Sequence, residues 1–219
     1  MNGPGNPQPA VSFAGILPGL MLLIGLEAAY WFGGPAVRRW LTGTWSLWLA
    51  ALLAISLAYL VVARQPPSAL GYRRERAFWL WMRGVAAGTL WRAFSMVTHY
   101  YGWWEFLPGP ALGISWTGLV GALLLIPLLE ETFFRGYLQS GLEARLGPAA
   151  AILIQALLFA LHPAHAAQGW RAFPSIWLYG LLAGGLYWQT RSIWILYGAH
   201  GMANLLPQII DQAGRWLYG

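Results

Sequence analysis

The chain contains no cysteine and no lysine, and charged residues make up only 9% of its 219 residues. The lack of cysteine excludes disulfide bonds and thiol catalysis. Soluble domains carry roughly 25% charged residues, whereas 58% of the residues here are hydrophobic. This composition excludes an ordinary soluble domain and predicts an integral membrane protein.

The positive charge comes from arginines alone, and most of them lie at the ends of apolar runs. That placement is typical of membrane anchoring rather than of a nucleic-acid site, so we expect the lipid bilayer as a partner and no nucleic acid. If the loop between the second and third runs is cytoplasmic, the positive-inside rule favours an N-terminus inside and a C-terminus outside. The arginines of this loop are Arg64, Arg73, Arg74 and Arg76.

The apolar runs are separated by glycine, proline and arginine. Because a spanning helix needs about 20 residues, the pattern predicts an all-α polytopic bundle of about seven transmembrane spans. The turn between the fourth and fifth runs is expected at Gly147 and Pro148, since glycine ends helices and proline begins them. The runs cover residues 11–32, 44–63, 77–100, 113–145, 149–161, 173–188 and 193–210.

An acidic cluster interrupts the fourth run, where Glu130 and Glu131 follow an apolar stretch and precede Arg135. Ionisable groups within a membrane cost at least a few kcal/mol each unless they are paired or solvated, so they point to function. Positions four apart on a helix nearly superimpose, whereas adjacent residues diverge by about 100°. Arg135 is therefore expected to pair with Glu131, and Glu130 is expected to point elsewhere.

Other polar residues fall at a matching depth. Glu130 lies 16 residues before Leu146, and His162 lies 16 residues after it. In an antiparallel helix pair both residues then sit about 24 Å from the turn and can face each other. His200 and Asn204 share one face of the last helix, because they are four residues apart.

Such a cluster suits hydrolysis by water. A carboxylate and an imidazole in a low-dielectric pocket can hold and deprotonate a water molecule. A second imidazole and an amide can stabilise the oxyanion of a tetrahedral intermediate. No serine lies in a Gly-x-Ser-x-Gly motif, and Ser140 and Ser192 fall at the ends of helices, so the sequence offers no rival nucleophile.

The motifs Glu130-Glu131-x-x-x-Arg135, Phe159-x-x-His162 and His200-x-x-x-Asn204 occur in that order. Over residues 116–207 the chain thereby resembles the CPBP family of intramembrane glutamic endopeptidases, which includes CAAX proteases and bacteriocin-processing enzymes. The resemblance implies that Glu130 and His162 activate water, and that His200 and Asn204 form the oxyanion site. Glu131, Arg135 and Phe159 would support them.

The second motif departs from the family pattern, which places phenylalanine four residues before histidine. Phe159 stands three residues before His162, and Leu158 occupies the usual position. His165 is therefore an alternative for the same role. His162 is favoured here because its depth matches that of Glu130.

The expected division is an N-terminal helical part, residues 1–110, and a CPBP-like catalytic core, residues 111–219. We expect a multi-pass protein of a bacterial cytoplasmic membrane that acts on a membrane-anchored or lipidated protein or peptide. No cofactor is expected; a glutamate and two histidines could bind zinc, but a His-Glu-x-x-His motif is absent. The alternatives are a non-catalytic scaffold or immunity protein, and a proton or ion transporter.

Overall fold

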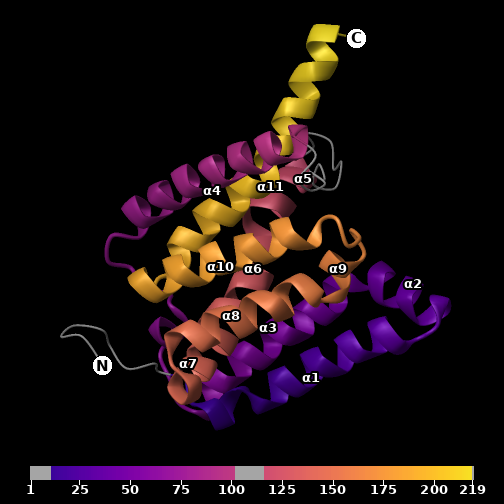
Figure 1. Ribbon diagram of the computed structural model, residues 1–219. Coiled ribbons are helices and arrows are strands. Elements are labelled where there is room, and N and C mark those ends of the chain that lie inside the picture. The colour runs from indigo at the N-terminus through magenta and orange to yellow at the C-terminus, as the bar shows by residue number, and fades with distance from the viewer. Residues whose placement is uncertain (1–10, 102–115, 219) are drawn as a thin grey trace.

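The computed structural model describes residues 11–101 and 116–218, and throughout this part of the chain the regular structure is helical (Figure 1). This confirms the predicted all-α bundle. The principal helices are α1 (Phe13–Phe32), α2 (Pro35–Gly43), α3 (Trp45–Val62), α4 (Ala77–Tyr100), α5 (Trp116–Val120), α6 (Ile126–Glu131), α7 (Ser140–Leu146), α8 (Pro148–Leu161), α9 (Pro163–Ala166), α10 (Phe173–Thr190) and α11 (Ile193–Tyr218).

The predicted runs agree closely with the helices. In the described residues, three helices are long and apolar enough to cross a membrane, namely Phe13–Phe32, Trp45–Val62 and Trp116–Leu146. The count of about seven spans stays a prediction. The expected start of the fourth helix near residue 113 and the domain boundary after residue 110 lie outside the described residues. The short helices α2 and α9, each with proline at its start, were not predicted.

The helix from Trp116 to Leu146 is continuous but not uniform. It includes two π-helical stretches, Gly121–Leu125 and Thr132–Gln139, on either side of α6. It ends at Gly147, whose φ of 78° lies in the region that favours glycine. The predicted turn into α8 is thus confirmed, and it sets α6 and the end of α8 at comparable depth.

The last helix packs closely along α4, as Figure 1 shows. Gly84 and Gly88 of α4 and Gly198 of α11 all face the backbone of the opposite helix, at positions where a Cβ atom would clash with it. Small residues permit this approach of two membrane helices. Gly198 thus allows the close packing, and the packing fixes the helix that carries His200.

Candidate active site

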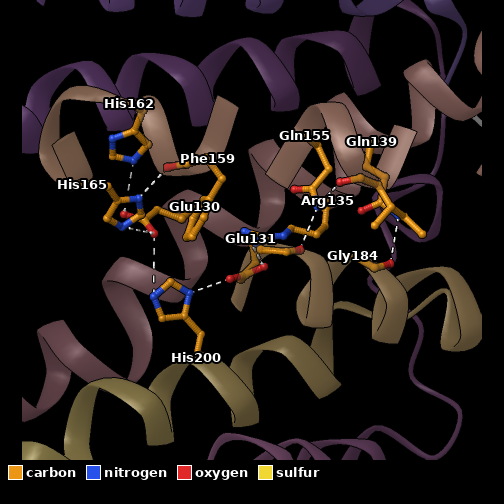
Figure 2. Close-up of polar contacts among 12 residues, drawn as sticks. Glu130, Glu131, Arg135, Gln139, Gln155, Phe159, His162, His165, Gly184 and His200 are labelled. Carbon is orange, nitrogen blue, oxygen red and sulfur yellow. Dashed lines mark hydrogen bonds and ion pairs between the residues drawn. The ribbon is translucent and has the colours of Figure 1, made fainter. Parts of the chain in front are cut away.

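Glu130 lies at the centre of the polar cluster and is 3% exposed (Figure 2). Three imidazole nitrogens surround its carboxylate: Nε2 of His162 at 3.8 Å, Nε2 of His165 at 3.8 Å and Nε2 of His200 at 3.7 Å. These distances exceed those of direct hydrogen bonds but suit contacts through one water molecule. The structure thus brings His162 to Glu130, as the sequence spacing predicts, and adds His165 and His200.

Glu131 turns away from Glu130 and bridges Arg135 and His200. Its Oε2 lies 3.1 Å from Nη1 of Arg135, one helical turn later. Its Oε1 lies 2.5 Å from Nδ1 of His200, across the bundle. Because the carboxylate accepts the Nδ1–H, it holds the His200 ring with Nε2 directed at Glu130. Figure 2 shows this chain of contacts.

Phe159 supports two members of the cluster at once. Its ring lies beneath the buried Arg135 guanidinium, with the guanidinium carbon 4.1 Å from the ring centre. Such cation–π contacts stabilise an Arg that is removed from water. Its backbone carbonyl lies 2.7 Å from Nδ1 of His165. The predicted supporting positions of Phe159, Glu131 and Arg135 are therefore next to the predicted catalytic ones.

His162 is held in a mostly aromatic enclosure. Its ring stacks on the rings of His165 and Phe134, with ring centres 4.3 Å and 5.5 Å away. The Trp48 ring packs edge-to-face against it, with the two ring centres 5.0 Å apart. Trp48 is fixed by its indole N–H, which donates to the carbonyl of Leu41. Sequence reasoning missed Trp48, because nothing distinguishes it from the many tryptophans that anchor membrane helices.

A cavity of about 400 Å³ reaches the cluster from one end of the bundle. Glu130, His165, His200 and Asn204 all line it, so the two predicted oxyanion residues share a space with the predicted base. The Asn204 amide donates a loose 3.4 Å hydrogen bond to the carbonyl of Ala122. The remaining lining residues are Thr42, Trp45, Ala122, Ile126, Ala164, Ala167, Gln168 and Gln208.

One group in the described residues has the composition of a metal site. The ligand atoms of Glu130, His162 and His165 lie within 4.8 Å of one another. Two imidazoles and a carboxylate are also the protein ligands of some catalytic zinc sites. The structure therefore supplies two chemical uses for the same three side chains, direct activation of water or coordination of a cation.

Comparison with protein families gives one match. Residues 111–206 match the family described as Rce1-like: Type II CAAX prenyl endopeptidase Rce1-like. This segment is therefore similar to the CPBP/CAAX protease family, and it contains every predicted site residue. Comparisons with curated proteins and with solved structures gave no match.

Proposed function

We propose that this chain, an integral membrane protein with an Rce1-like domain, is a glutamic intramembrane endopeptidase that hydrolyses a peptide bond with water held by Glu130. One observation carries the proposal: the buried carboxylate of Glu130 faces a cavity and has three imidazole nitrogens at water-bridging distance. Convergent titratable groups in a cleft are typical of active sites. We assign the catalytic machinery to residues 111–219, and helices α1, α3 and α4 pack against its described helices.

In the proposed reaction, Glu130 holds the water, and an adjacent imidazole takes up one of its protons as the water oxygen bonds to the substrate carbonyl carbon. His162 is the imidazole that the sequence favours. His200 and Asn204 face the same cavity, and the amide of Asn204 donates a hydrogen bond to the oxyanion. His200 donates from Nε2 when both of its ring nitrogens carry hydrogen, because Glu131 already accepts the Nδ1–H. Collapse of the intermediate breaks the C–N bond, and the leaving nitrogen receives the proton.

The proposed substrate is a membrane-anchored or lipidated protein or peptide. The cavity is lined by residues of α2, α3, α9 and α11 at one end of the bundle. Most loop arginines lie at the opposite end, where the α3–α4 loop contacts the start of α11 through a hydrogen bond from Ile193 to Gly71. The positive-inside rule makes that opposite end cytoplasmic. In a bacterial cytoplasmic membrane the cavity then opens outward, which favours exported substrates.

The test compares membrane-protein termini in the native host between the wild type and Glu130→Gln. Glutamine keeps the shape of the side chain but lacks the negative charge that holds the water and stabilises the protonated imidazole, so termini produced by the enzyme should disappear. Identical terminal profiles, with a host phenotype that still depends on the protein, would support a scaffold instead. Proton or ion flux into liposomes without a cleaved product would support a transporter.

A further inference from the structure

His162 and His165 both approach Glu130, but their rings are held in opposite ways. Nδ1 of His165 lies 2.7 Å from the carbonyl oxygen of Phe159. A carbonyl can only accept a hydrogen bond, so Nδ1 carries the hydrogen. In a neutral imidazole the other nitrogen then has a free lone pair. Nε2 of His165 therefore presents an acceptor toward Oε2 of Glu130, 3.8 Å away.

The His162 ring has the reverse arrangement. Its Nδ1 accepts the backbone N–H of Ala164 at 3.1 Å, as the side-chain cap of α9. Pro163 begins that helix and lacks an N–H, so the Ala164 N–H is the next donor available to the cap. With Nδ1 accepting, the hydrogen of neutral His162 is on Nε2. His162 therefore presents a donor toward Oε1 of Glu130, 3.8 Å away.

The two rings also differ in access to the cavity. His165 lines it and its side chain is 13% exposed. His162 is fully buried behind its neighbouring ring and is not among the lining residues. A substrate or water molecule that enters the cavity thus meets His165 first.

We infer that His165, rather than His162, is the imidazole that accepts the proton of the attacking water, and that His162 is a positioning residue that orients Glu130. The inference deepens the proposed function and rests on it. A water between Oε2 of Glu130 and Nε2 of His165 points one O–H bond at each acceptor. Its oxygen lone pairs stay free to attack the carbonyl carbon, whereas an N–H donor would occupy one of them.

The step balances as follows. The water oxygen bonds to the carbonyl carbon while one of its protons moves to Nε2 of His165, and the electron pair of the C=O bond moves to the oxyanion. The C–N bond then breaks, and His165 returns its proton to the leaving nitrogen. The second water hydrogen stays on the new carboxyl group.

The same ring orientations bear on metal binding. A histidine that ligates through Nε2 normally donates its Nδ1–H to an acceptor. His165 meets this condition, but His162 does not, because its Nδ1 faces a backbone N–H. Only Glu130 and His165 then remain as metal ligands, because His162 is oriented as a hydrogen-bond donor. Two ligands are fewer than the three of a catalytic zinc site, which favours direct activation of water.

The first test needs no substrate. Protein labelled with ¹³C and ¹⁵N in histidine is measured by NMR in detergent micelles, with His162→Gln and His165→Gln used to assign the signals. We expect a neutral His165 with its hydrogen on Nδ1 and a neutral His162 with its hydrogen on Nε2. The opposite pair of tautomers, or the same tautomer for both rings, would overturn the inference.

The second test follows a terminus whose formation depends on Glu130. His165→Gln removes the proton-accepting nitrogen and should slow cleavage by about 10²–10⁴-fold. His162→Gln keeps an N–H donor at the position of Nε2 and should cost no more than about tenfold, whereas His162→Leu should cost far more. This rescue by glutamine distinguishes a donor from a merely space-filling side chain.

Three outcomes of the second test contradict the assignment. If His162→Gln abolishes cleavage and His165→Gln does not, His162 is the proton acceptor. If a chelator abolishes wild-type cleavage and Zn²⁺ restores it, the cluster is a metal site. If no terminus depends on Glu130, the proposed function itself fails, and the NMR result still decides the two tautomers separately.

Discussion

Two buried polar clusters, around Glu130 and Glu143, lie on one continuous helix, more than about three turns apart. Around Glu130 the Nε2 atoms of the three histidines lie 3.7–3.8 Å from the carboxylate oxygens. Oε2 of Glu130 and Nε2 of His162 have no hydrogen-bond partner. Around Glu143 the contacts are short: Arg191 lies 2.6 Å away, and the amide of Gln139 donates at 2.9 Å. Gln139 also donates to the carbonyl of Gly184 at 3.0 Å (Figure 2).

The difference separates a structural network from the cluster that we propose to be reactive. Buried polar groups normally satisfy one another. In the Glu143 cluster the carboxylate has two close partners and ties α7 to the end of α10, while Oε1 of Gln139 has no hydrogen-bond partner. The Glu130 cluster leaves polar atoms directed at a cavity, where a water and a substrate can complete their contacts. Equivalent side chains in the two clusters should therefore affect different measurements, the rate in one and the stability in the other.

The two carboxylates provide the largest contrast. We expect Glu130→Gln to slow cleavage by about 10⁴-fold, because the carboxylate holds the attacking water and its charge stabilises the imidazolium that forms when His165 takes up the proton. Its thermal unfolding in detergent should change little. Glu143→Gln should instead lower the free energy of unfolding by about 3–5 kcal/mol, because it removes one partner of a buried ion pair. If Glu130→Gln and Glu143→Gln lowered the cleavage rate per folded molecule equally, the two clusters would not differ in function.

The two amides sharpen the comparison with a smaller effect. Asn204→Ala should lower the cleavage rate by about 10²–10³-fold, as the loss of one oxyanion donor does, without loss of stability. Gln139→Ala should leave the rate per folded molecule unchanged and lower the free energy of unfolding by about 1–3 kcal/mol, since its partners become unsatisfied. Thermal unfolding and steady-state cleavage of both variants provide the check. An unchanged rate in Asn204→Ala would remove this residue from the site.

The sequence predicted which residues lie at the same level in the bundle, but not how their side chains are oriented. Glu130 and His162 meet because helical rise is regular and Gly147 fixes the turn between them. The ring orientations of the histidines could not be predicted, since they depend on a short turn at Pro163. Trp48 lies far away in the sequence, and only packing of α3 brings it to His162.

Glu131 combines features of both clusters and should show an intermediate effect. Its contacts are short, as in the structural network, but one partner is the predicted oxyanion residue His200. We expect Glu131→Gln to slow cleavage by about 10–100-fold, because a charged hydrogen bond contributes about 1.5–3 kcal/mol. It should also lower the unfolding temperature. A variant with lower stability and an unchanged rate per folded molecule would make Glu131 purely structural.

The smallest effect is expected at Glu27 of α1, a buried carboxyl group outside both clusters. It is 8% exposed, and its Oε1 has no hydrogen-bond partner. An unsatisfied buried polar group costs about 1–3 kcal/mol, so Glu27→Leu should raise the free energy of unfolding by about 1 kcal/mol after some loss of fit. Cleavage should not change, because this side chain neither lines the cavity nor contacts Glu130. A fall in the cleavage rate without loss of stability would instead show that Glu27 of α1 belongs to the reactive cluster. The comparison of the two clusters would then have to include a second helix.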